Sequence, residues 1–220
     1  MDGAFHLSTP GGDAGAPAPS RADAVRNRAR VLSTTIDMLR SKGADVSVDE
    51  IARAAGVGAG TVVRSFGGKQ KLIDCAVAEL LRPVVEQSRA AAQSPQAGQM
   101  LGQLLLDLAL FHRESRVLNA KLTSMSMPNA ERLQEELLAN FTHVVQSAQR
   151  AGVVRPDITM ADVTLLLAGV ERAADETLGS VDQLRRYITI VTDGLRPAHP
   201  TELPPVGRRS PRSKQRGCAP

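Results

Sequence analysis

Apolar residues recur along most of this chain at intervals of three and four, which is the spacing of one face of an α-helix. The first stripe consists of Val25, Ala29, Leu32, Ile36 and Leu39. It predicts an amphipathic helix that ends near Gly43. No segment alternates apolar and polar residues for long enough to predict a strand. The pattern therefore predicts an all-α protein of about nine helices.

A glycine turn separates the second predicted helix from the third. Ser47 and Glu50 have the spacing of a capping box, so a helix is expected to begin at Ser47. Gly56 can adopt the left-handed conformation that ends this helix, and a third helix is expected over Ala59–Phe66. Three short helices followed by a long one form the layout of a helix-turn-helix module. In such a module the helix after the turn lies in the major groove of DNA.

Longer helices and two polar ends complete the chain. Glycines 67 and 68 end the third helix, and a fourth is expected from Lys69 to about Gln93, with Pro83 inside it. Further stripes predict helices around residues 100–111, 118–125, 128–152, 160–178 and 181–195. Residues 1–20, rich in Gly, Ala, Pro and Ser, are expected to form a disordered leader, and residues 197–220 a disordered basic tail.

Composition is typical of a globular protein, with 42% hydrophobic and 23% charged residues. Every apolar stretch is interrupted well before the ~20 residues that cross a bilayer. The first twenty residues lack the cationic start and apolar block of a secretory signal. We therefore expect a cytoplasmic protein that does not bind membranes. Cys75 and Cys218 lie far apart and outside any CxxC motif, which argues against a zinc site or a disulfide framework.

Charge is unevenly distributed and favours a polyanionic partner for the N-terminal third. Residues 21–74 carry a net charge of +4, whereas residues 75–196 carry −2. A basic region of this kind fits one domain that binds nucleic acid while the rest serves another purpose. The chain has only one Tyr and four Phe and no Trp, too few for the stacking surfaces that bind single strands. Double-stranded DNA is the expected partner.

The helix over Ala59–Phe66 has residue types suited to reading DNA. Gly60 allows close approach of the backbone to a phosphate, Thr61 supplies a hydroxyl donor, and Arg64 can contact guanine or a phosphate. Lys69 opens the next helix, where its ammonium and the free N–H groups favour an anion. The full set of expected DNA-binding residues is Ser47, Ala59, Gly60, Thr61, Val63, Arg64, Ser65 and Lys69. Four arginines form either an added cationic arm or a solvated helix face: Arg21, Arg26, Arg28 and Arg30.

The segment Ser47–Leu72 resembles the DNA-binding domain of TetR-family transcriptional regulators. The matching positions are Ile51-Ala52, Ala55-Gly56-Val57, Gly60-Thr61, Phe66, and Lys69 with Leu72. The resemblance covers about fifty residues, from Arg21 to Cys75, and residues 152–157 are similar to the segment before the penultimate helix in that family. The chain departs from the family pattern at Gly58, Val63 and Ser65, where Ser, Tyr and often His are usual. Val63 lacks the hydrogen-bond donor of the usual tyrosine.

The resemblance implies a homodimer that binds a palindromic operator, most often as a repressor. Residues 21–68 would form the DNA-binding domain and residues 69–196 an effector-binding and dimerisation domain. The last two helices would form the dimer interface, through Leu165, Ala168, Gly169, Arg172, Leu184, Ile188, Val191 and Leu195. These stripes could equally fill the core of the monomer. An unidentified small-molecule effector would occupy a pocket lined by Phe111, His112, Asn140 and His143.

Other classes of function have less support in the sequence. Residues 56–61 imitate a glycine-rich phosphate loop, but a helix precedes them where a dinucleotide site requires a strand. His112 and His143 lack the spacing of a metal site, so no metal or cofactor is expected. No spacing suggests a nucleophile with its base, so an enzyme is not expected. The alternative is a helical protein-interaction module whose helix-turn-helix no longer binds DNA, which Gly58 and Val63 would favour.

Overall fold

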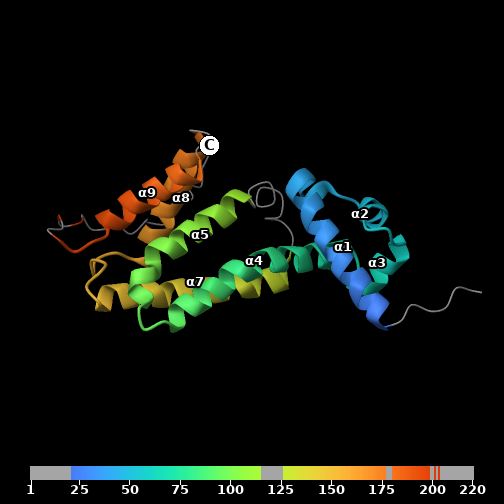
Figure 1. Ribbon diagram of the computed structural model, residues 1–220, viewed down its shortest axis with the longest axis horizontal. Helices are drawn as coiled ribbons and strands as arrows, with labels where there is room; N and C mark the ends of the chain where they lie inside the picture. Colours follow the sequence, from blue (N-terminus) through green and yellow to red (C-terminus); the bar gives the residue numbers. More distant parts are fainter. Residues whose placement is uncertain (1–20, 115–125, 177–179, 199–200, 202, 204–220) are drawn as a thin grey trace, which may run out of the picture. The chain divides into compact units, whose positions relative to one another are not determined.

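The computed structural model describes residues 21–114, 126–176, 180–198, 201 and 203. The predicted leader, the short segment at 118–125, Leu178 and most of the basic tail lie outside these residues. Within the described part, every regular element is helical, which confirms the all-α prediction (Figure 1). The helices are α1 (Arg21–Lys42), α2 (Val48–Ala54), α3 (Ala59–Phe66), α4 (Lys69–Gln93), α5 (Leu101–Glu114), α7 (Pro128–Arg150), α8 (Met160–Glu176) and α9 (Val181–Gly194). Two 3₁₀ turns cover Gly43–Asp45 and Ala97–Met100.

The described residues fall into two compact units. Residues 21–80 and 126–130 form the first unit, and the remaining described residues, from Leu81 and from Glu131 onward, form the second. The first unit therefore holds α1, α2, α3 and the start of α4. The second holds the rest of α4, α5, α8, α9 and most of α7.

The core of the first unit is formed where α1, α2 and α3 pack together. Its largest side chains exposed by less than 2% are Val31, Leu39, Val46, Ile51, Val62, Leu72 and Ile73. The stripe predicted for α1 is wrong at its beginning, because Val25 is 64% exposed and Ala29 is exposed. The first ten residues of α1 contain no buried side chain. Full burial in α1 begins at Val31.

A buried carboxylate fastens the start of α7 to the first unit. Asp74 of α4, which is 3% exposed, accepts a hydrogen bond from the backbone N–H of Ala130 at 3.0 Å. Its other oxygen accepts from the backbone N–H of Asn129 at 3.2 Å and from the Asn129 side chain at 2.7 Å. The first N–H groups of a helix have no partner inside the helix, so the carboxylate acts as the cap of α7.

The second unit is closed by tight contacts along α7. Gly98 is buried against it, and a Cβ at Gly98 would stand 2.7 Å from the Cα of Ala148, closer than any side chain permits. On the same helix, Asn140 donates to the Ser88 hydroxyl at 3.0 Å. These contacts fix α7 against the end of α4 and the 3₁₀ turn that precedes α5.

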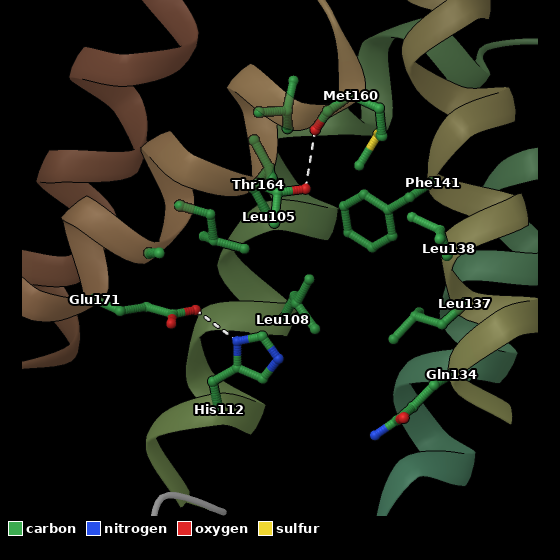
Figure 2. Close-up of a pocket in the computed structure, with 13 residues that line it drawn as sticks. Leu105, Leu108, His112, Gln134, Leu137, Leu138, Phe141, Met160, Thr164 and Glu171 are labelled. Carbon is green, nitrogen blue, oxygen red and sulfur yellow. Dashed lines mark hydrogen bonds and ion pairs between the residues drawn. The ribbon is translucent and has the colours of Figure 1, made fainter. Parts of the chain in front are cut away.

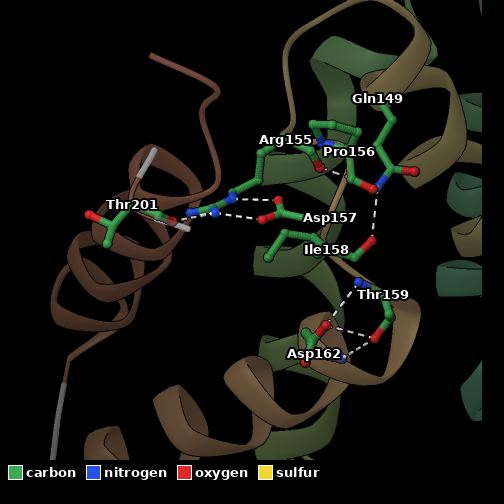
Figure 3. A network of polar contacts seen from close by, with 8 residues as sticks. All are labelled: Gln149, Arg155, Pro156, Asp157, Ile158, Thr159, Asp162 and Thr201. Atoms are coloured by element: carbon green, nitrogen blue, oxygen red, sulfur yellow. Dashed lines mark hydrogen bonds and ion pairs between the residues drawn. The ribbon is translucent and has the colours of Figure 1, made fainter. Parts of the chain in front are cut away.

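The connection between α7 and α8 is held by a polar network (Figure 3). The Gln149 amide donates to three backbone carbonyls, the nearest that of Ile158 at 2.9 Å. The Arg155 guanidinium, nearly fully buried, binds both oxygens of Asp157 at 2.6 Å and the carbonyl of Thr201 at 2.7 Å. The hydrogen bonds from Arg155 lower the pKa of Asp157. Thr201 lies in the segment predicted to be a free tail, and here it has a fixed partner.

Candidate functional site

The capping box predicted at the start of α2 is present. The Ser47 hydroxyl accepts from the Glu50 backbone N–H at 3.1 Å, and the Glu50 carboxylate accepts from the Ser47 N–H at 2.9 Å. Hydrogen bonds from the backbone and the side chain of Ser47, together with Lys42 3.4 Å away, lower the pKa of Glu50 to about 2. Ser47 is half-buried at the N-cap of α2.

The turn and α3 have the bounds that the sequence predicts. Gly56 has φ +65°, Gly58 is the N-cap, and Gly67, with φ +79°, ends the helix in the left-handed conformation. Val62 and Phe66 are the buried residues of α3. They lie four positions apart, so a single narrow stripe packs α3 into the core of its unit. Most of the circumference of the helix faces outward.

The outward face of α3 carries the residues expected to read DNA. Val63 is 48% exposed, Arg64 and Gly60 are exposed, and Thr61 and Ser65 are half-buried. The guanidinium of Arg64 lies 3.4 Å from the Thr61 hydroxyl, so two residues assigned to the same task touch each other. Ala59, the first residue of α3, is half-buried, and Lys69, exposed, is the first residue of α4. The helix contains no acidic residue, so nothing on it repels a phosphate.

Arg28 supports α3 from α1, a role the sequence did not reveal. Its guanidinium lies 4.1 Å from the centre of the Phe66 ring and donates to the carbonyl of Ser65. A cation at the C-terminal end of a helix is favoured by the helix dipole, and one over an aromatic face by the ring. Arg28 is therefore a positioning residue. Arg26 pairs with Asp23, and Arg30 donates to Asn27 at 2.7 Å, both along α1 itself.

A largely apolar cavity lies in the second unit between α5, α7 and α8 (Figure 2). Its volume is about 220 Å³, and His112 and Glu171 bring a polar pair to its wall, with Nδ1 and Oε1 2.7 Å apart. Of the four residues predicted to line a pocket, His112 lines this one. The prediction is not met here for the other three: Phe111 lies beside His112, Asn140 bonds to Ser88, and His143 is exposed. Helical spacing identified the helices but not the side of each that faces the cavity.

The predicted dimer stripe of α9 is divided between two faces. Leu184, Ile188 and Leu195 are buried within their own unit, so they fill the monomer core. An exposed apolar groove lies on the other side, where Ile190 is 56% exposed and Leu165 of α8 is 71% exposed. The groove is lined by Leu165, Leu166, Gly169, Val170, Ala173, Tyr187, Ile190 and Val191. Ala168 lines the cavity instead, and Arg172 is exposed outside the groove lining.

Among the described residues, no helix is both long and apolar enough to cross a membrane.

Two family models match the chain. The model for bacterial regulatory proteins of the tetR family matches residues 31–75, and the model for the C-terminal domain of SbtR-like transcriptional regulators matches residues 96–197. The first spans α2, the turn and α3, and the second spans both the cavity and the exposed groove. No curated protein matches.

Several solved structures share the fold. A TetR transcription regulatory protein from Mycobacterium vanbaalenii is 33% identical, with a TM-score of 0.58, and the match covers 80% of this chain and 98% of that one. The TetR transcriptional regulator SCO0520 from Streptomyces coelicolor is 26% identical, with a TM-score of 0.54, over 78% of this chain and 99% of that one. The regulator PfmR from Thermus thermophilus, 18% identical with a TM-score of 0.59 over 76% of this chain and 99% of that one, is similar in fold alone.

Proposed function

Because the chain belongs to the TetR family and is a DNA-binding transcriptional regulator rather than an enzyme, we propose that it is a ligand-responsive homodimeric repressor of a palindromic operator. The observation that carries the proposal is the exposed face of α3, which presents Thr61, Val63 and Arg64 on a helix without acidic residues. The rival interaction module with a degenerate helix-turn-helix would not need this face to stay cationic and uncovered.

We assign different tasks to Arg64 on this face and to Lys69 at the start of α4. Arg64 lies inside α3 and is long enough to reach the floor of the major groove, so it reads a base edge. Lys69 stands at the start of α4, where the free N–H groups of a helix also attract an anion, so it holds a phosphate. Val63 offers methyl groups, which suit contact with the methyl group of thymine.

Selection of bound sequences from random duplex DNA would give the operator and allow these roles to be separated. Arg64→Ala should cost about 1–3 kcal/mol on the selected site and relax the preference at one base pair. Lys69→Ala should weaken all sequences alike and lower the salt slope of log affinity by about one unit. Arg132→Ala, an exposed arginine on α7, is the matched control and should change neither. If Arg64→Ala lowers the salt slope with its base preference intact, Arg64 is a phosphate contact.

We assign dimerisation to the exposed groove of α8 and α9 rather than to the buried stripe. Large apolar side chains gathered on one surface are typical of an interface, and a second copy offers the same surface in return. Ile190→Asp should therefore yield a folded monomer, since the side chain is exposed and surface changes cost about 0.5 kcal/mol or less in the fold. Ile188→Asp, at a site 4% exposed, should instead unfold the second unit, because it buries an unpaired charge.

Light scattering and thermal unfolding distinguish these outcomes. Thr189→Asp, exposed on α9 and outside the groove lining, is the matched control and should remain a dimer. A dimer that survives Ile190→Asp would remove the groove from the interface.

Ligand response is assigned to the cavity between α5, α7 and α8. An effector bound there would favour one arrangement of the helices that line it, and typical coupling of 1–3 kcal/mol would weaken operator binding about 5- to 150-fold. Repression predicts that deleting the protein raises transcription from the selected operator. A fall in transcription would show an activator.

A further inference from the structure

The walls and the polar pair of the cavity limit the chemistry of its ligand. Most of its lining consists of Leu, Val, Met, Ala and Phe side chains, so the body of a ligand must be apolar (Figure 2). Thr164 contributes little polarity, because its hydroxyl donates to the carbonyl of Met160 at 2.9 Å. Gln134, the other polar side chain of the lining, is exposed, so the polar contacts of a ligand concentrate near His112 and Glu171.

The pair of His112 and Glu171 accepts hydrogen bonds and carries no excess positive charge. If His112 is neutral, its Nδ1–H donates to Glu171, its Nε2 is a further acceptor and the pair has a charge of about −1; if it is protonated, the pair is neutral and Nε2–H is a donor. In both states the second oxygen of Glu171 remains an acceptor. None of the thirteen residues that line the cavity is Lys or Arg. A ligand carboxylate would thus place a second negative charge beside Glu171, whose side chain is 24% exposed.

We propose that the cavity binds an aliphatic molecule whose head group donates hydrogen bonds, an alcohol or an amine, and that it discriminates against aliphatic carboxylates. Glu171 is the specificity-determining residue, and His112 orients its carboxylate across the 2.7 Å contact. The proposal rests on the cavity being the effector site, and it names the class of molecule that this site selects.

Titration calorimetry on the full chain without DNA tests the discrimination with three ligands of equal chain length. We expect octan-1-ol and octylamine to bind about tenfold more tightly than octanoate. Glu171→Gln keeps the shape of the side chain and removes its charge, so the difference should fall to about threefold or less. Glu135→Gln, at an exposed carboxylate on α7, is the matched control and should keep the full difference.

The binding site itself is checked by Thr164→Trp, which fills the cavity from an exposed position and should abolish binding of all three ligands. The proposal is overturned if octanoate binds as tightly as the alcohol and the amine, if none of the three binds, or if Glu171→Gln leaves the difference intact. A ligand that binds as expected but leaves operator affinity unchanged would refute the effector role, not the ligand class.

Discussion

Asp74 offers a quantitative test of how the start of α7 is held. Replacing it with Ala removes the acceptor of three hydrogen bonds. The Asn129 side chain is exposed and can turn to water. The bond from the Asn129 backbone N–H, at 3.2 Å, is the longest of the three, so neither loss should be large. The N–H of Ala130, a residue 1% exposed, is left without a partner.

An unsatisfied buried N–H costs about 1–3 kcal/mol, and loss of a helix cap costs about 1 kcal/mol. Removing the buried carboxylate recovers part of its desolvation cost. The expected net loss for Asp74→Ala is about 2 kcal/mol, which lowers the unfolding temperature by about 4–8 °C in a chain of this size. Asp74→Asn keeps an oxygen for Ala130 and should cost about half as much.

Thermal unfolding at one protein concentration measures the loss, and hydrogen exchange of the segment from Met127 to Leu133 locates it. Faster exchange is expected there in Asp74→Ala. Asp37→Ala, at an exposed position on α1, is the control and should behave as the unmodified protein. An unfolding temperature within 1 °C of the unmodified protein, with unchanged exchange at Ala130, would refute the capping role.

Two further predictions concern the capping carboxylate of Glu50 and the ion pair of Arg155 with Asp157. The folded pKa of Glu50, about 2, lies below its ordinary 4.5, so its ionised form stabilises the fold above pH 4.5 and this contribution is lost as pH falls toward 2. The unfolding temperature of Glu50→Gln should therefore lie below that of the unmodified protein at pH 7 and approach it at low pH; a constant gap would contradict this. Arg155→Lys cannot bind both oxygens of Asp157 and the Thr201 carbonyl together, so hydrogen exchange around Thr201 should quicken, whereas Arg196→Lys, in an exposed pair, should leave it unchanged.

Local signals predicted the helix-turn-helix closely. The capping box, the glycine at the turn and the glycine pair after Phe66 act within a few residues of the helix ends that they set, so their effects can be read from the sequence. The bond between Asp74 and Ala130 gives no such signal, because its partners lie 56 residues apart. Gly98 is similar. It must lack a side chain because α7, which is distant in the sequence, packs against its backbone.

The sides of helices were harder to predict than their ends. Ile188 belongs to the predicted stripe of α9 and Ile190 does not; successive residues turn by about 100°, so the two side chains point to nearly opposite sides of the helix. Which side is buried depends on α5 and α8, whose placement the pattern of α9 does not contain. The same reason explains why His112 lines the cavity while Asn140, also predicted to do so, turns to Ser88.

The departures from the family pattern fall where the fold tolerates change. Val63 is nearly half exposed, and a Cβ at Gly58 would meet nothing closer than the Thr61 hydroxyl at 3.9 Å, so serine would fit there. Ser65 contributes its backbone carbonyl, not its side chain, to the contact with Arg28. An eight-residue helix is marginal alone, and α3 is held by Val62, Phe66 and Arg28, which the departures leave in place. Substitutions on the outward face can therefore change which DNA sequence is bound without displacing the helix.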